Sequence, residues 1–411
     1  MTAQHACRFC DARLSRIVID LGMSPLSNAL IEPDRAADEE HVFPLRAYVC
    51  ERCWLVQVPA FESRDEIFRE YSYFSSYSTT WLEHSRAYAA AAVAKLGLSQ
   101  RHLVVELASN DGYLLKEFRA RSIPVLGIEP ARNVAREAVA AGIPTVAEFF
   151  GAALARRLVS EGRSADLIVA NNVLAHVPDV NDFVAGIAAL LKPGGTATLE
   201  FPHLLRMLQR AEFDTIYHEH FSYFSLRTAQ RIFESHALRV DDVEELSTHG
   251  GSLRVWIRHA DDDAGPSASV AAVLSDERDA CLETIDAYSS LQDDAAKIKR
   301  GLIDFLQEAR RAGKRVAGYG APAKATTLLN YCGVRADLLP YTVDASPHKQ
   351  GRMIPGVRVP IEPPERIFQT KPDYVLVLPW NIKDEIVDQM AGIRDWGGRF
   401  VVPIPALEIL D

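Results

Sequence analysis

The chain has 411 residues, of which 48% are hydrophobic and 24% charged, and its mean hydropathy is -0.05. This length exceeds what one hydrophobic core supports, so we expect two or three domains. The formal net charge of -10 argues against nucleic acid or an anionic membrane as a partner, but leaves room for an anionic small molecule in a local basic pocket. No apolar stretch approaches bilayer-spanning length and the first residues lack a signal-peptide pattern, so we expect a cytoplasmic protein without a membrane partner.

Four of the six cysteines are spaced for metal binding. Cys7 and Cys10 form one C-x2-C pair, and Cys50 and Cys53 form a second. Two such turns complete a tetrahedral Zn²⁺ site with no open position, so the metal would be structural. A redox pair or chance spacing are the alternatives. The other two cysteines stand alone in apolar contexts and are expected to be buried core thiols, at positions Cys281 and Cys332.

The middle of the chain alternates strands and helices. Residues 102–107 have the composition of a buried strand, and they run into a turn of small residues and then a helix, which is how a doubly wound sheet begins. Glu129 ends the next strand, where a carboxylate can accept hydrogen bonds from both hydroxyls of a ribose. A Rossmann-like domain for another nucleotide is the alternative. The elements after the first turn are expected at 113–121 (helix), 123–128 (strand), 131–142 (helix), 143–150 (strand), 166–170 (strand), 182–192 (helix) and 196–201 (strand).

The tetrapeptide Tyr217-His218-Glu219-His220 places several proton donors and acceptors among aromatic residues. Imidazole titrates near neutrality and can accept a proton at working pH, and aromatic neighbours exclude water. Taken alone, the same pattern fits a structural cluster or a His-rich solvated turn.

The last third of the chain begins with a charged segment, residues 261–312, expected to be a linker followed by one long helix. A second strand–loop–helix unit follows, in which Gly318 and Gly320 allow close backbone approach and Lys324 at the helix start suits a diphosphate. This predicts a second, smaller Rossmann-like sheet. Its alternative role is purely structural.

These features together resemble the S-adenosylmethionine (SAM)-dependent sugar C-methyltransferases that act on nucleotide-linked 4-keto deoxysugars, such as the dTDP-sugar C-3 methyltransferases. The resemblance covers nearly the whole chain and rests on motifs in a fixed order: the cysteine pairs, YSYFSSYS, ELASNDG, NNVLAHV, LLKPGG, TIYHEHFSYFS, HGGSLR and GYGAPAK. It implies an α/β protein with a zinc-binding module at 1–70, a class I SAM methyltransferase Rossmann-like domain at 71–260 and a smaller Rossmann-like domain for the nucleotide sugar at 261–411. A monomer is compatible with having both binding domains in one chain.

The resemblance also implies roles for single residues. His220 would be the base that removes a proton next to the ketone, and His218 is expected to be structural. His176 has an alternative as a helix-capping or core imidazole. The other residues expected around the reacting carbon are Tyr217, Glu219, His176 and Tyr71; those expected to bind SAM are Glu106, Ser109, Asn110, Asp111, Gly112, Glu129, Glu148, Phe149, Asn171 and Asn172; those expected to bind the sugar nucleotide are Tyr73, His249, Ser252, Lys324, Lys349 and Arg352.

One position departs from the family pattern. Ala108 stands where the family has glycine at the start of the SAM loop, which is tolerated if the backbone keeps a negative φ. The function alternatives are a same-fold methyltransferase acting on another carbon acid or on oxygen or nitrogen of a sugar, and a binding protein without chemistry.

Overall fold

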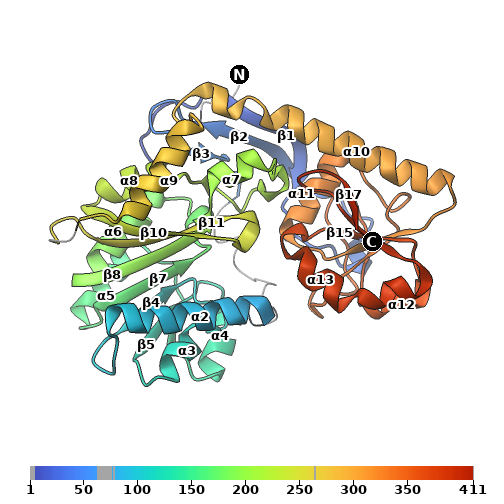
Figure 1. Cartoon of the computed structure of the whole chain (residues 1–411). Coiled ribbons are helices and arrows are strands. Elements are labelled where there is room, and N and C mark those ends of the chain that lie inside the picture. The colour runs from blue at the N-terminus through green and yellow to red at the C-terminus, as the bar shows by residue number, and fades with distance from the viewer. Residues whose placement is uncertain (1–4, 63–75, 77–78, 263–264, 411) are drawn as a thin grey trace.

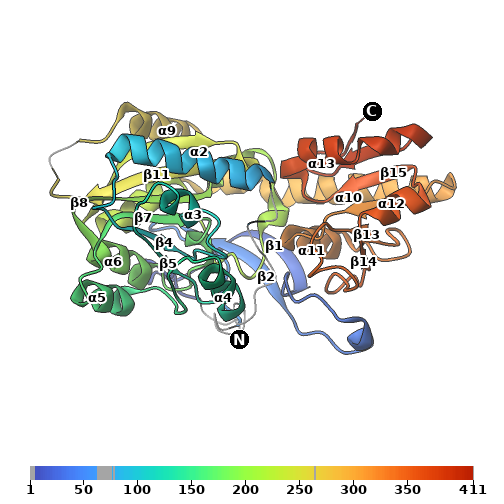
Figure 2. The same cartoon turned by 90° about the horizontal axis from the view of Figure 1, so that it is seen from below.

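The computed structural model describes residues 5–62, 76, 79–262 and 265–410. Within these ranges the chain forms three β-sheets, of four, seven and six strands. The seven-stranded and six-stranded sheets lie side by side, and the N-terminal hairpin and the long helix α10 (Leu291–Arg311) run above them (Figure 1). The view from below separates the same two lobes (Figure 2).

The N-terminal sheet is antiparallel and recruits a strand from much later in the chain. Its order is β1-β2-β3-β9. The fourth strand is only two residues long and begins just after His220. The strands are β1 (Arg16–Pro25), β2 (Val42–Val49), β3 (Val56–Gln57) and β9 (Ser222–Tyr223).

The seven-stranded sheet has the order β10-β11-β8-β7-β4-β5-β6. The five strands from β8 to β6 are parallel and wind in both directions from β4, as in a doubly wound fold, and β11 is antiparallel to both of its neighbours. The strands are β4 (Val104–Leu107), β5 (Val125–Ile128), β6 (Thr145–Val146), β7 (Ala165–Asn171), β8 (Leu191–Pro202), β10 (Leu238–Leu246) and β11 (Ser252–His259).

Helices cover both faces of this sheet, which explains why β4 and β5 are buried throughout and have mostly apolar sequences. Helix α5 was not among the elements expected from the sequence. The helices are α2 (Thr79–Leu96), α3 (Leu115–Arg119), α4 (Arg132–Ala140), α5 (Ala152–Ser160), α6 (Val180–Leu190), α7 (Leu204–Gln209) and α8 (Leu226–Glu234).

The C-terminal sheet has the order β14-β13-β12-β15-β16-β17, with only β17 antiparallel. Its strands are β12 (Val316–Tyr319), β13 (Thr342–Val343), β14 (Ile361–Glu362), β15 (Tyr374–Val377), β16 (Arg399–Val402) and β17 (Glu408–Leu410). Its helices are α11 (Ala323–Cys332), α12 (Glu365–Thr370) and α13 (Lys383–Gln389). Short 3₁₀ turns are η1 (Pro33–Arg35), η3 (Leu174–His176), η4 (Phe213–Thr215), η5 (Thr248–Gly250), η6 (Ile285–Tyr288), η7 (Trp380–Ile382) and η8 (Ala391–Trp396).

The single long helix expected before this sheet is wrong. Helix α9 (Ala268–Asp279) is followed by its C-cap Ala280, and α10 starts only at Leu291. Cys281 adopts a φ of 56° directly after α9, which breaks the helix and leaves its thiol exposed. The expectation of a buried thiol therefore holds for Cys332 but is wrong for Cys281.

One hydrophobic core joins three distant parts of the chain. It contains Val18 and Leu45 of the N-terminal sheet, Phe213 and Ile216 before the tetrapeptide, and Leu328 of the C-terminal helix α11. The segment that carries Tyr217–His220 is therefore packed between the N-terminal and C-terminal sheets rather than displayed on a free loop.

Candidate active site

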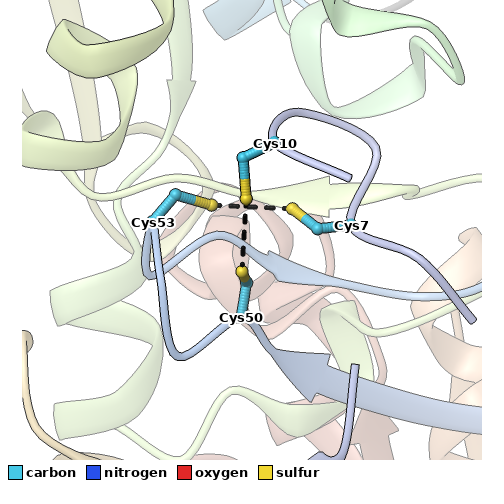
Figure 3. A group of neighbouring side chains, drawn as sticks. All are labelled: Cys7, Cys10, Cys50 and Cys53. Carbon is cyan, nitrogen blue, oxygen red and sulfur yellow. Dashed lines mark hydrogen bonds between the residues drawn. The ribbon is translucent and has the colours of Figure 1, made fainter. Parts of the chain in front are cut away.

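Four cysteine side chains from two N-terminal loops point toward one another (Figure 3). The Sγ atoms of Cys7 and Cys53 are 3.5 Å apart, those of Cys10 and Cys50 are 3.6 Å apart, and all four lie within 4.8 Å of one another. Sulfurs on a tetrahedral zinc ion, each about 2.3 Å from the metal, are roughly 3.8 Å apart. The cluster fits a zinc ion, and its four thiolates leave no open position, so the metal has a structural role.

The zinc module supports the neighbourhood of the tetrapeptide. The second cysteine loop continues into β3, where Val56 and Gln57 pair with Tyr223 and Ser222 of β9. Because β9 begins just after His220, the metal-bound loop holds the C-terminal side of the tetrapeptide.

The carboxyl ends of β4 and β7 carry buried polar atoms that have no hydrogen-bond partner among the described residues. Leaving such groups unpaired costs about 1–3 kcal/mol each, so their accumulation marks a site for a polar ligand. All five residues were expected to bind SAM from the sequence, and the site fits that cofactor. The atoms are Oε2 of Glu106, Oγ of Ser109, Oδ1 of Asp111, both amide atoms of Asn171 and Oδ1 of Asn172.

The turn after β4 is held by the acid at the end of β5. Glu129 accepts hydrogen bonds from the backbone N–H groups of Asn110 (2.9 Å) and Ala131 (2.8 Å), one on each carboxylate oxygen, and burial raises its pKa to about 7. Gly112 has a φ of +80°, and a Cβ there would lie 2.7 Å from Cγ1 of Ile143. Glycine is therefore required at this position by both conformation and space.

The backbone at Ala108 does not have the negative φ under which alanine is expected to be tolerated there. Its φ is 55°, in the left-handed region, so the methyl group is accommodated at a conformational cost rather than avoided. Glu148 and Phe149, expected near adenine, follow β6; the Glu148 carboxylate lies 2.5 Å from Nη2 of Arg157, and Phe149 is half-buried.

His220 is neutral and its tautomer is defined by its neighbours. Its Nδ1 is 2.9 Å from the carbonyl oxygen of Thr215, and because a carbonyl can only accept, the ring proton is on Nδ1. The lone pair on Nε2 then accepts a hydrogen bond from the Tyr217 hydroxyl at 2.6 Å, and the two rings stack with centroids 3.9 Å apart. Burial, and then the nearby His176 and His249, lower the pKa of His220 well below its usual value.

His176 lies beside His220, with ring centroids 4.6 Å apart in a T-shaped arrangement. It stands in η3, just beyond the carboxyl end of β7, and its Nδ1 donates to the backbone carbonyl of Glu219 at 2.8 Å. Burial lowers its pKa to about 4. Two neutral imidazoles therefore face each other at the same edge of the sheet as the SAM loops.

The other two members of the tetrapeptide turn toward the N-terminal module. Oε1 of Glu219 accepts from the backbone N–H of Asn28 at 3.1 Å, so its carboxylate points away from His220, and burial raises its pKa. His218 packs edge-on against Phe43 and Phe61. The side chains of Glu219 and His218 therefore both make contacts with the N-terminal module that hold the tetrapeptide turn in place.

His249 connects the SAM loops to this cluster. Its Nε2 lies 3.2 Å from Nδ2 of Asn172, its ring contacts Trp81 of α2, and burial lowers its pKa to about 4. Ser252, also expected at the substrate, is buried in β11 and donates to the carbonyl of Thr248.

Lys324 lies in a buried charged cluster between the two lobes. Its ammonium is 4.0 Å from the centre of the Trp380 ring and donates to Asn381, and burial lowers its pKa to about 8. Glu212 and Asp214 attract it, and burial raises their pKa values to about 8 and about 6. Neither the two acids nor Trp380 was predicted from the sequence. Only the FDT stretch before the tetrapeptide offered a signal for Asp214.

Three predicted substrate residues, Tyr73, Lys349 and Arg352, and one residue predicted at the reacting carbon, Tyr71, remain. Lys349 donates to the carbonyl of Ala321 at 3.0 Å, next to the glycine loop of the C-terminal sheet. Arg352 pairs with Glu32 of the N-terminal module at 2.7 Å and so is engaged elsewhere. Tyr71 and Tyr73 lie outside the described residues.

The chain has a doubly wound sheet with buried, unpaired polar atoms at the carboxyl ends of its strands and a histidine cluster beside them. This combination defines an α/β SAM-dependent methyltransferase of class I. Family models agree with this class. A zinc binding domain matches residues 7–68, a methyltransferase domain matches residues 81–243, and a C-methyltransferase C-terminal domain matches residues 247–405. The expected fold class and the expected cofactors, SAM and structural zinc, are confirmed.

The chain is 36% identical over 404 residues to the C-methyltransferase NovU of Streptomyces niveus, covering 98% of this chain and 96% of that protein. It therefore belongs to the SAM-dependent C-methyltransferases. Among solved structures, the magnesium protoporphyrin IX methyltransferase of Synechocystis PCC 6803 matches at 15% identity and a TM-score of 0.33, covering 43% of this chain and 81% of that one. The methyltransferase CcbJ of Streptomyces caelestis matches at 13% identity and a TM-score of 0.33, covering 43% and 89%.

Helices long and apolar enough to cross a membrane are absent from the part of the chain that the structure describes.

Proposed function

We propose that this C-methyltransferase deprotonates C-3 of a dTDP-linked 4-keto deoxysugar and methylates that carbon. His220 carries the proposal. It is neutral and half-buried, its ring lies beside that of His176 in the turn after β7, and its tautomer directs the basic nitrogen Nε2 toward Tyr217 and away from the backbone. A hydrogen next to a ketone is acidic because the electron pair left behind delocalises onto the oxygen, so such a site needs a base and a donor.

The chemistry divides between His220 and Tyr217. The Tyr217 hydroxyl occupies Nε2 in the structure, at 2.6 Å. If the Tyr217 hydroxyl donated its hydrogen bond to the ketone oxygen of the sugar instead, Nε2 would be free to accept a proton. The same hydroxyl would then be the donor that stabilises the enolate oxygen. The carbon-bound proton then goes to Nε2, and the C–H electron pair forms the enolate. SAM, when bound, supplies the electrophilic methyl group that the carbon takes up.

His176 and His249 supply a second function in this proposal. Both are neutral at physiological pH because burial lowers their pKa values to about 4. Because these imidazoles are neutral, they do not repel the positively charged sulfonium of SAM. Their rings also exclude water from the enolate. By the family resemblance, Tyr71 would also act at the reacting carbon, and Glu219 would position the turn.

The sugar nucleotide is proposed to bind mainly in the C-terminal domain. Support comes from the glycine loop after β12, where the Ala321 N–H donates to Asp344 at 2.7 Å and Lys349 lies against the same loop. Lys324, at the start of α11, is a cation attracted to Glu212 and Asp214 of the segment before the tetrapeptide. Titration with dTDP is expected to show binding that Lys349→Ala and Lys324→Met weaken, and indifference to both substitutions would argue against this site.

One assay tests the reaction. The protein is incubated with isotope-labelled SAM and a panel of dTDP-linked and UDP-linked 4-keto sugars, and mass spectrometry detects the gain of one methyl group, which NMR locates on carbon, nitrogen or oxygen. Without SAM, exchange of the C-3 hydrogen in deuterium oxide reports deprotonation alone. His220→Asn is expected to abolish both while SAM binding persists. His236→Asn, which changes a histidine far from the cluster, serves as the control. Normal exchange in His220→Asn would remove His220 as the base.

A further inference from the structure

Two residues of the C-terminal domain donate hydrogen bonds to the segment before the tetrapeptide, one on each side of Thr215. The indole N–H of Trp380 donates to Oδ2 of Asp214 at 2.8 Å. The hydroxyl of Thr327, in α11, donates to the backbone carbonyl of Ile216 at 2.8 Å. Thr215 lies between these two anchored residues. The peptide group that carries its carbonyl also donates, through the Ile216 N–H, to the Phe213 carbonyl at 3.0 Å, and the two anchors on either side further limit its rotation.

The carbonyl of Thr215 is the group that places the ring proton of His220. It accepts from Nδ1 of His220 at 2.9 Å and from the Tyr223 hydroxyl at 3.4 Å. If this carbonyl turned away, Nδ1 would lose its acceptor and the proton could move to Nε2. Imidazole protonated at Nε2 has no lone pair on the side that Tyr217 occupies, and it could not serve there as a base.

Packing around these two hydrogen bonds also restrains the 213–216 segment. Helix α11 packs directly on η4, and the rings of Phe213 and Tyr331 meet edge to face at 5.2 Å. Asp214 is fully buried, and the ammonium of Lys324 lies over the Trp380 ring at 4.0 Å. Charge attraction between Lys324 and Asp214 therefore adds to the Trp380 hydrogen bond.

We propose that Trp380 and Thr327 are positioning residues that fix the tautomer of His220 through the carbonyl of Thr215. The C-terminal domain thereby sets the state of the base in addition to any part in holding substrate. The catalytic consequence rests on the proposed function, whereas the tautomer itself does not.

The tautomer is measured by NMR of the full chain labelled with ¹⁵N at histidine, where long-range ¹H–¹⁵N spectra separate a protonated from an unprotonated ring nitrogen. His220→Asn assigns the signal. The wild type is expected to show Nδ1 protonated and Nε2 unprotonated. Thr327→Val removes one donor with almost no change in volume, whereas Trp380→Phe removes the other donor together with three ring atoms. Each single variant is expected to populate the Nε2-protonated form in part, and the double variant to populate it further.

Deuterium exchange at the substrate carbon gives the functional readout. Loss of a hydrogen bond is expected to slow exchange about fivefold for each single variant and roughly 20-fold for the double variant, with SAM affinity unchanged. Thr327→Ser keeps the hydroxyl and is expected to restore both signals. Thr370→Val is the matched control, because its hydroxyl, in the same domain, donates to the Arg366 carbonyl at 3.0 Å and not to the 214–216 segment.

The outcomes separate the two proposals. An unchanged His220 tautomer in the double variant, with SAM binding intact, overturns the positioning role whatever the enzyme methylates. A shifted tautomer with unchanged carbon exchange supports the positioning role and removes His220 as the base. If the Trp380 variants fail to fold, as loss of SAM binding would report, the Val and Ser substitutions at Thr327 decide, because a purely structural role would leave the tautomer the same in both.

Discussion

Ala108 offers a quantitative test of the SAM loop. Its φ of 55° is a conformation that costs a non-glycine residue about 1–2 kcal/mol. Ala108→Gly removes that cost but gives the unfolded chain more conformational freedom, worth about 0.4–1 kcal/mol. The net expectation is a gain in unfolding free energy of about 0.5–1 kcal/mol, or a rise in the melting temperature of roughly 1–3 °C.

The same geometry predicts little change in SAM affinity. The loop already follows the path that glycine would allow, so we expect the dissociation constant for SAM, measured by calorimetry, to stay within about twofold. Ala237→Gly is the matched control. Ala237 has the same φ of 55° but is exposed in the turn before β10, away from the SAM loops.

Both substitutions are therefore expected to raise the melting temperature similarly. A destabilised Ala108→Gly beside a stabilised Ala237→Gly would refute the strain argument. A tenfold change in SAM affinity for Ala108→Gly alone would show that the methyl group contacts the cofactor or shapes the loop directly.

Three further predictions follow from the site. Tyr217→Phe is expected to slow carbon deuterium exchange roughly 100-fold by removing the enolate donor while SAM still binds in calorimetry; full exchange would contradict the donor role. Cys50→Ser is expected to lower bound zinc by elemental analysis and to lose activity with it, because β3 and β9 lose their anchor; an active zinc-free protein would contradict this. His249 has a folded pKa of about 4 against 6.5 when unfolded, so the unfolded chain binds the extra proton between these values and stability falls as pH drops. Compared with His249→Asn, the wild type should lose roughly 3 kcal/mol over that window in denaturant titrations, and parallel pH profiles would refute it.

The sequence alone predicted the zinc ligands and the succession of strands along the parallel part of the central sheet. Four cysteines in two C-x2-C turns have few other uses, and an apolar strand followed by a small-residue turn and a helix is a local pattern. The sequence did not predict α5. It also joined α9 to α10, whereas in the structure Cys281 has a left-handed backbone and η6 lies between the two helices.

Only the tertiary structure decided the direction of the side chains around the tetrapeptide. No periodicity in a turn says that Glu219 points to Asn28 while His220 points to Thr215. Likewise, the contact between Asp214 of η4 and Trp380 of η7 joins residues 166 positions apart, and no local signal encodes it. Short-range patterns determine which elements form, whereas the environment of a buried group is set by what packs against it from elsewhere in the chain.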